Sequence, residues 1–165
     1  MNHNLFVALR GAFPTDLNAT AVETDNGLHY SWQDLERASA MLANLLDSLD
    51  LPPRSRVAVQ VEKSVEAMLL YLATLRAGHV FLPLNTAYQS AEVAYFVGNA
   101  EPAVVVCTGK NFGWVSKIAF QAGTRHVFTL NDDRTGSLLE RAAHHSDQHT
   151  PAPCAAASSA VVRAS

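Results

Sequence analysis

The chain has 165 residues, of which 48% are hydrophobic and 16% are charged, and its formal net charge is −3 at pH 7. This length and apolar content suit one globular domain with a real core, and they exclude a chain that is disordered over most of its length. The Lys and Arg residues are scattered along the sequence, which argues against nucleic acid or an anionic membrane surface as a partner.

The sequence also carries no export or membrane signal. No stretch approaches the roughly 18 uninterrupted apolar residues of a membrane-spanning helix, and the N-terminal MNHNLFVALRGAFPTD lacks a basic start and a long apolar run. The two cysteines, Cys107 and Cys154, are too few for a disulfide framework or, by themselves, a tetrahedral metal site. We therefore predict a cytoplasmic protein with no membrane contact.

The N-terminal part predicts a hairpin followed by an amphipathic helix. Thr20–Glu23 and Leu28–Tyr30 are short strand candidates around an Asp-Asn-Gly turn, whose Asn-Gly step readily takes positive φ. Ser31, with Asp34 three residues later, resembles a helix-capping box, and Pro52-Pro53 excludes a helix from that point. The apolar stripe of this helix comprises Leu35, Ala38, Met41, Leu42, Leu45, Leu46 and Leu49.

The middle of the chain predicts a strand, a helix and a second strand with tight joints. Val57–Val61 is a compact apolar run that suits a buried strand. Ser64 can cap a helix over Val65–Ala77, in which all residues but three are apolar, so more than one side must be covered. Gly78 follows where a left-handed residue ends a helix, and Val80–Leu82 is a strand, which completes a βαβ unit.

The same alternation continues to residue 144. It predicts a three-layer α/β fold with a mostly parallel sheet, flanking helices and an N-terminal β-hairpin. The further elements are a helix from Ser90 to Ala100, a strand over Ala103–Cys107, a helix over Asn111–Ala122, a strand over His126–Leu130 and a helix over Ser137–His144.

The last residues differ in kind. Thr150–Ser165 is rich in Ala, Ser and Pro, without a periodicity that would bury a face, and the helical potential of Ala155–Val162 is weak. We therefore expect a domain over residues 1–149 and a disordered tail over residues 150–165.

Several segments together resemble one family. The stretches VQVEKSVEAMLLYLATLRAGHVFLPLNTAY and YFVGNAEPAVVVC, with NLFVALR, HYSWQDLERASAMLANLL and GSLLERA in the same order, are similar to the N-terminal part of malonyl-CoA synthetases. These belong to the adenylate-forming acyl-CoA ligase superfamily of AMP-binding enzymes. The resemblance covers about residues 2–145, and the segment from Glu62 to Tyr88 favours the malonate-type subgroup.

The resemblance implies a two-step reaction in the complete enzyme. ATP and a malonate-type acid form an acyl-adenylate and pyrophosphate with the help of Mg²⁺, and CoA then displaces AMP. Beyond Thr150 the resemblance stops, because a Ser/Thr/Gly-rich phosphate loop ending in Lys should follow and CAAASSAVVRAS does not match it. It therefore implies a chain truncated before that loop, inactive alone, with no catalytic, cofactor-binding or metal-binding residue to carry over and no cofactor of its own.

Three groups of residues are candidates to replace the missing phosphate loop and ligand-binding segments. Gly109-Lys110-Asn111 echoes the end of a phosphate loop, but the first glycine and the final Ser or Thr are missing. Glu62-Lys63-Ser64 and Asn85-Thr86-Tyr88 follow two predicted parallel strands, where ligands bind in open α/β sheets. For both turns a structural role is favoured, and a ligand-binding role remains open.

For two further groups of residues, a structural or solvent-exposed role is favoured over a chemical one. His144, His145, Asp147 and His149 could be read as a zinc site, but their place at a helix end before the expected tail favours exposed histidines. Cys107 ends the apolar run AVVVC and is expected to be a small buried residue, not a nucleophile.

Three functions remain open. The chain is the N-terminal piece of a malonyl-CoA-synthetase-like ligase, a stand-alone α/β module that binds a small ligand, or a scaffold that docks onto a partner. If Met68, Leu69, Leu70, Leu72 and Leu75 are half uncovered, each loses about 1 kcal/mol of burial energy. That loss would leave the chain marginally stable and prone to self-association through an exposed sheet edge and an apolar helix surface.

Overall fold

The computed structural model describes residues 1–154, and the predicted weak helix over Ala155–Val162 lies outside this range. The predicted α/β alternation is confirmed, with small shifts at the element ends. The elements are α1 (Leu5–Gly11), β1 (Thr20–Glu23), β2 (His29–Ser31), α2 (Trp32–Ser48), β3 (Arg56–Gln60), α3 (Val65–Arg76), β4 (Val80–Pro83), α4 (Ser90–Ala100), β5 (Val104–Cys107), the 3₁₀ turn η1 (Gly109–Asn111), α5 (Phe112–Gln121), β6 (His126–Thr129) and α6 (Ser137–Ala142).

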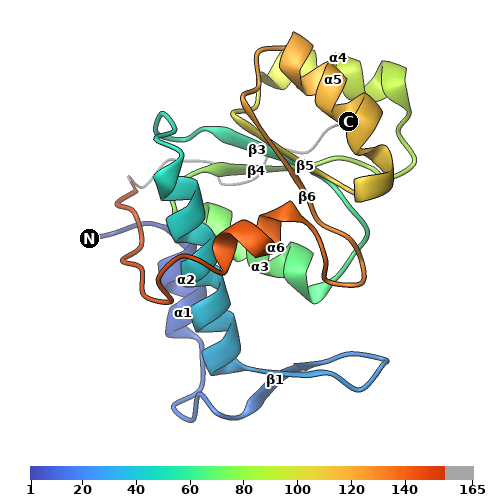
Figure 1. Cartoon of the computed structure of the whole chain (residues 1–165). Helices are drawn as coiled ribbons and strands as arrows, with labels where there is room; N and C mark the ends of the chain where they lie inside the picture. Colours follow the sequence, from blue (N-terminus) through green and yellow to red (C-terminus); the bar gives the residue numbers. More distant parts are fainter. Residues whose placement is uncertain (155–165) are drawn as a thin grey trace.

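The main sheet has four parallel strands in the order β4-β3-β5-β6. Strand β3 comes first in the chain, β4 pairs on one side of it and β5 on the other, so the order reverses between β3 and β5. Helices α2, α3 and α6 cover one face and α4 and α5 cover the other (Figure 1). The predicted three-layer fold is therefore confirmed.

A separate antiparallel hairpin, β1–β2, packs against α2 and projects from the body of the molecule (Figure 1). Gly27 takes φ +83° in its turn, as the Asn-Gly step predicts. The second strand begins one residue later than expected, because the carbonyl of Leu28 accepts a hydrogen bond from the Thr24 N–H and belongs to the turn.

Side-chain caps begin two central helices as the sequence predicts. The Ser31 hydroxyl accepts from the Asp34 N–H at 3.0 Å, and the Asp34 carboxylate accepts from the Ser31 N–H at 2.9 Å. At α3, the Ser64 hydroxyl accepts from the Ala67 N–H at 3.1 Å. Each contact satisfies a backbone donor that the first helical turn leaves unpaired.

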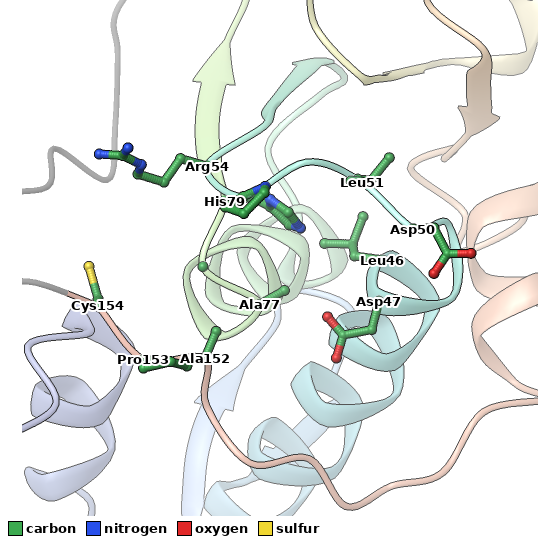
Figure 2. Close-up of a pocket in the computed structure, with 12 residues that line it drawn as sticks. Leu46, Asp47, Asp50, Leu51, Arg54, Ala77, His79, Ala152, Pro153 and Cys154 are labelled. Carbon is green, nitrogen blue, oxygen red and sulfur yellow. The ribbon is translucent and has the colours of Figure 1, made fainter.

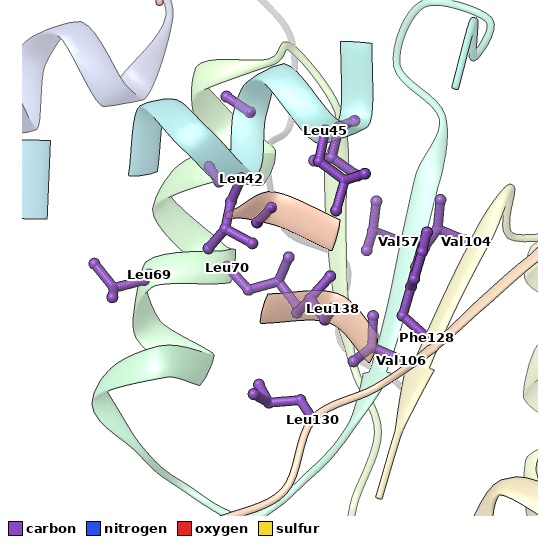
Figure 3. Close-up of a cluster of buried hydrophobic side chains, with 14 of the residues drawn as sticks. Leu42, Leu45, Val57, Leu69, Leu70, Val104, Val106, Phe128, Leu130 and Leu138 are labelled. Atoms are coloured by element: carbon purple, nitrogen blue, oxygen red, sulfur yellow. The ribbon is translucent and has the colours of Figure 1, made fainter. Parts of the chain in front are cut away.

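The larger core cluster lies between the sheet and helices α2, α3 and α6 (Figure 3). Successive residues of β3 serve opposite faces, since Val57 and Val59 enter this cluster while Ala58 enters a smaller one under α4 and α5. The residues labelled in Figure 3 are Leu42, Leu45, Val57, Leu69, Leu70, Val104, Val106, Phe128, Leu130 and Leu138.

The expected loss of burial on α3 is wrong for four of its five residues. Leu69, Leu70, Leu72 and Leu75 are between 0% and 9% exposed, and Met68 alone is 36% exposed. Helix α2 covers one side of α3, and α1, which the sequence did not predict, covers another by inserting Phe6 against Leu72 and Leu75. The burial of these four leucines therefore removes the reason to expect a marginally stable chain.

Residues 146–154, which we call the strap, run back along α2 to the N-terminus (Figure 1). The Asn44 amide donates to the carbonyls of Ser146 and Gln148, and the Ala152 N–H donates to the Arg76 carbonyl at 2.8 Å. The N-terminal Asn2 and Asn4 side chains also donate to the Ala152 carbonyl. Pro151, Ala152 and Cys154 of the expected tail are thus hydrogen-bonded to the domain, and residues 155–165 lie outside the described range.

Arg76 joins the strap, α1 and α2 at one buried point. Its side chain is 1% exposed, and its guanidinium donates to the Glu36 carboxylate at 2.9 Å, to the Ser39 hydroxyl at 3.1 Å and to the His149 carbonyl. The same group lies 4.7 Å from the centre of the Phe6 ring. Burial lowers the pKa of Arg76, and Glu36 opposes that shift, so the charge is kept by its partners.

We expect Arg76→Met to lower the free energy of unfolding by about 3 to 5 kcal/mol, because it leaves the Glu36 carboxylate without its main partner. Arg37→Met is the matched control, since Arg37 is 59% exposed and lies 3.7 Å from Asp147, and it should cost at most about 1 kcal/mol. Urea unfolding at pH 7 measures both. Equal losses in the two variants would show that Arg76 does not join these segments.

Candidate functional site

The two turns that the sequence places after parallel strands line one groove. The groove has a volume of about 900 Å³ and lies at the carboxyl end of β3 and β4, beside α3. Its polar rim is formed by Glu62, Lys63 and Ser64 on one side and by Asn85, Thr86 and Tyr88 on the other. The structure therefore brings together both groups singled out from the sequence, at the sheet edge where open α/β folds bind ligands.

The floor of this carboxyl-edge groove is apolar and aromatic. The Tyr71 and Phe81 rings meet edge to face at 5.3 Å, and Met68 lies beside them with 36% of its surface exposed. The remaining apolar lining comprises Val59, Val61, Ala67, Pro83 and Leu84. Such a surface suits an apolar or flat group better than a strongly charged one.

Gln60, at the end of β3, fixes the turn that forms one side of the rim. It is 2% exposed, and its amide donates to the carbonyl of Asn85 at 2.9 Å and to that of Tyr88 at 3.1 Å. Its side-chain oxygen is buried without a partner among the described residues. This role could not be predicted from the sequence, because Asn85 and Tyr88 lie 25 and 28 residues after Gln60.

Strand β4 has no neighbour on its outer side among the described residues. Val80 and Leu84 donate their N–H groups toward β3, so the intervening Phe81 and Pro83 direct their backbone outward. Pro83 has no N–H to offer, which weakens this edge as a template for a further strand. The expected self-association through an open sheet edge therefore gains no support from β4.

The rim charges do not form a catalytic arrangement. Glu62 and Lys63 are exposed, and the Ser64 hydroxyl is occupied as the cap of α3. No described residue in the groove places a general base within hydrogen-bonding distance of a nucleophile, which acid–base and nucleophilic catalysis require.

The echo of a phosphate loop is a different structure. Gly109-Lys110-Asn111 forms the 3₁₀ turn η1, and the Gly109 N–H donates to the Asn131 side-chain oxygen at 2.8 Å. A phosphate loop presents its N–H groups to the ligand. The Gly109 donor is already engaged, so this segment is not a phosphate loop.

The histidine-rich segment does not form a metal site. Among residues 1–154 no three His, Cys, Asp or Glu side chains gather to hold a metal ion. The expectation of exposed histidines is wrong for His149, whose side chain is 5% exposed and whose Nε2 lies 2.7 Å from Asp47. The pairing could not be foreseen, because Asp47 lies 102 residues earlier.

Cys107 is a buried core residue, as expected. It is 0% exposed beneath α4 and α5, and burial raises the pKa of its thiol to about 12. A thiol that stays protonated at neutral pH and lacks access is not a nucleophile.

The match to known families confirms the resemblance. Residues 12–162 match the AMP-binding enzyme family, and the chain belongs to it. The similar curated proteins include a nonribosomal peptide synthetase of Pyrenophora dematioidea, 33% identical over 115 residues that cover 70% of this chain and 8% of that protein. Tyrocidine synthase 1 of Brevibacillus parabrevis is 30% identical over 143 residues, which cover 87% of this chain and 12% of that protein.

The solved structures agree with this assignment. Apo MatB from Rhodopseudomonas palustris superposes with a TM-score of 0.93 at 41% identity, over 99% of this chain and 32% of MatB. ATP-bound MatB from the same organism gives 0.91 at 42% identity, over 98% of this chain and 32% of MatB. The chain thus has the fold of the N-terminal part of an adenylate-forming ligase, and it spans about a third of MatB.

The residues present do not fit the ATP and Mg²⁺ that the family implies. Of the described groove residues, Glu62 is the one carboxylate and Lys63 the one cation, and both are exposed. Holding a triphosphate with its metal takes several N–H donors and cations around the phosphates, together with carboxylate or hydroxyl ligands. We therefore derive no step of nucleotide chemistry from these residues.

None of the described helices has the length and apolar character needed to cross a membrane.

We expect Gln60→Leu to lower the free energy of unfolding by about 1 to 2 kcal/mol, because two backbone carbonyls lose their donor. Amide hydrogen exchange of residues 84–89 should accelerate in the same variant. Gln121→Leu, the same change at an exposed position of α5, should leave both quantities unchanged. A Gln60 variant whose turn exchanges as slowly as in the unaltered chain would refute the role of Gln60.

In a Cys154→Ser background, we expect Cys107 to resist iodoacetamide at pH 8 in the folded chain and to react once urea unfolds it. The raised pKa of the folded thiol also has a pH signature. Stability should be constant below the ordinary thiol pKa of 9.0 and fall as the pH rises from there toward about 12, because the unfolded chain ionises first. Rapid labelling without denaturant would contradict the burial.

Proposed function

We propose that this chain forms the N-terminal part of a malonyl-CoA-synthetase-like ligase and does not activate a carboxylic acid by itself. The observation that carries the proposal is the superposition on MatB over 99% of the chain at 41% identity, together with the malonate-type motif from Glu62 to Tyr88. Curated relatives at 30–33% identity include peptide synthetases. The choice of malonate as the acid substrate therefore depends on the motif alone.

In the proposed complete reaction, a malonate oxygen attacks the α-phosphorus of ATP, and pyrophosphate leaves. The sulfur of CoA then attacks the acyl carbon, and AMP leaves. Both steps develop negative charge on oxygen, which must be stabilised by preorganised hydrogen-bond donors, cations and Mg²⁺. Each such donor stabilises the transition state by about 3 kcal/mol. We assign those groups to a part of the enzyme other than residues 1–154.

The contribution of this chain is then architectural. It supplies the parallel sheet, and the Gln60 amide holds the turn of Asn85 to Tyr88 at the edge where ligands bind in such folds. The groove rim and its aromatic floor form the surface nearest to that edge. In this proposal the complete enzyme is cytoplasmic, and its partners are a malonate-type acid, ATP and CoA.

A second candidate rests on the groove itself. A volume of about 900 Å³ lined by Tyr71, Phe81 and Met68 is large enough for a small organic ligand. A stand-alone binding module would use this groove without any catalysis, and it would bind its ligand in the absence of other ligase segments.

A chimera tests the first candidate. Residues 2–145 of this chain would replace the matching segment of R. palustris MatB, and acid-dependent exchange of pyrophosphate into ATP would be measured over a panel of carboxylic acids. We expect exchange within about tenfold of the unaltered host, with malonate the best substrate, since the nucleotide chemistry stays with the host.

Two comparisons make the result decisive. The chimera with Gln60→Leu should lose activity relative to the chimera with Gln121→Leu, and the purified 165-residue chain should show no exchange with any acid. A folded chimera without activity, or one that prefers an unrelated acid, would overturn the proposal. Turnover by the purified chain alone would overturn its second half.

A further inference from the structure

A second cavity lies at the opposite, amino-terminal edge of the sheet (Figure 2). Its volume is about 680 Å³, and four short segments from three distant parts of the sequence wall it. These are the end of α2 with Leu46 and Asp47, the turn from Asp50 to Arg54, the residues after α3 from Ala77 to His79, and the strap from Ala152 to Cys154. The groove of the proposed function lies at the other end of the strands.

His79 gives this amino-edge cavity its most specific feature. The residue is 7% exposed and lines the cavity, and its Nδ1 accepts a hydrogen bond from the Ser55 N–H at 3.2 Å. The accepting Nδ1 carries no proton, so in the neutral ring the proton is on Nε2. This Nε2–H has no hydrogen-bond partner among the described residues, and it is not one of the side-chain polar atoms that the protein encloses completely.

His79 is the neutral ring that this assignment requires. Burial lowers its pKa, and the negative charge of Asp47 opposes the shift. Because the charge of Asp47 affects the pKa of His79, the Asp47 carboxylate lies within electrostatic range of the ring. The ring is largely buried, and its Nε2–H, unpartnered among the described residues, is available to an acceptor atom that enters the cavity.

One part of the wall carries negative charge. Asp47 and Asp50 stand at the C-terminal end of α2, and α3 ends at Arg76, directly before the cavity residues Ala77 and Gly78. The carbonyls that end α3 already accept hydrogen bonds, the Arg76 carbonyl from the Ala152 N–H among them. Helix C-termini carry partial negative charge, so the end of α2 and the two carboxylates favour a cation here. Asp47 is engaged by His149, whereas Asp50 is exposed and makes no ion pair among the described residues.

The floor and the geometry limit what can bind. Leu46, Leu51, Pro53 and Ala77 provide an apolar surface between the charged and the neutral polar ends. Arg54 is exposed at the rim, and Figure 2 shows its side chain extending away from Asp47 and Asp50. No three metal-ligating side chains gather among the described residues, so the carboxylates are suited to an organic cation.

We propose that the amino-edge cavity binds a small aliphatic amine that also carries a hydroxyl or carbonyl oxygen. The ammonium group pairs with the carboxylate of Asp50 beside that of Asp47, the oxygen accepts the hydrogen bond of His79 Nε2–H, and the aliphatic chain covers Leu46 and Ala77. The site is independent of the carboxyl-edge groove and of any nucleotide chemistry.

Ligand analogues test the site on the unaltered chain. 4-Amino-1-butanol carries both groups, n-butylamine the charge alone, and 1,4-butanediol hydroxyls alone. Titrations at pH 7, followed by ¹H–¹⁵N chemical shifts, should show saturable changes at Asp50, Gly78 and His79 for the amino alcohol. Its affinity should exceed that of each single-function analogue by about threefold or more, and the ¹⁵N resonance of His79 Nε2 should move with it.

Matched variants locate the two contacts. Asp50→Asn keeps the shape of the side chain and removes its charge. It should weaken the binding of 4-amino-1-butanol by about tenfold without affecting the binding of 1,4-butanediol. His79→Asn keeps an acceptor for the Ser55 N–H and removes the Nε2 donor, so it should erase the advantage over n-butylamine. Glu62→Gln, at the other edge of the sheet, is the control and should leave the affinity for 4-amino-1-butanol unchanged.

Three results would overturn the proposal. The first is an unaltered chain whose shifts at Asp50 and His79 do not saturate with the amino alcohol. The second is equal affinity for the diol, which would show that charge plays no part. The third is unchanged binding in a folded Asp50→Asn variant. Since the first two measurements use the unaltered chain, a variant that fails to fold does not prevent a decision.

Discussion

The parallel direction of the four strands is the constraint from which the rest of the structure follows. Two parallel strands must be joined by a crossover that brings the chain back to the same edge of the sheet. Each strand is therefore followed by a helix, and both faces of the sheet are covered. The same constraint gathers the turns after β3 and β4 at one edge, where they form the carboxyl-edge groove. It also gathers the helix ends at the other edge, where the amino-edge cavity lies.

Arg76 determines how the outer segments are attached to this sheet. Its carbonyl and guanidinium between them reach α2, the strap and Phe6 of α1. A buried charge is costly unless every donor is used, and here the guanidinium has carboxylate, hydroxyl and carbonyl acceptors. The attachment explains why α3 is covered on more than one side within this chain.

The fold could be predicted because its signals are local. The caps at Ser31 and Ser64 and the left-handed Gly78 involve residues within a few positions of one another. Helix α1 was not predicted, because it is short and is held in place by long-range contacts. Phe6 packs against α3, and the Asn4 side chain donates to the Leu75 carbonyl 71 residues away. The groove rim could be anticipated from strand ends, whereas the roles of Gln60, His79 and His149 depend on contacts 24 or more residues distant.

In this chain the scaffold of the family is present without the groups that carry out the family's chemistry among the described residues. The chain belongs to the AMP-binding enzymes, yet its described residues offer one exposed cation and one exposed carboxylate at the groove. Isothermal titration of the purified 165-residue chain with ATP and Mg²⁺ tests this separation most directly. We expect no saturable binding at millimolar nucleotide, and tight binding that distinguishes ATP from other triphosphates would show that the chain holds a nucleotide site.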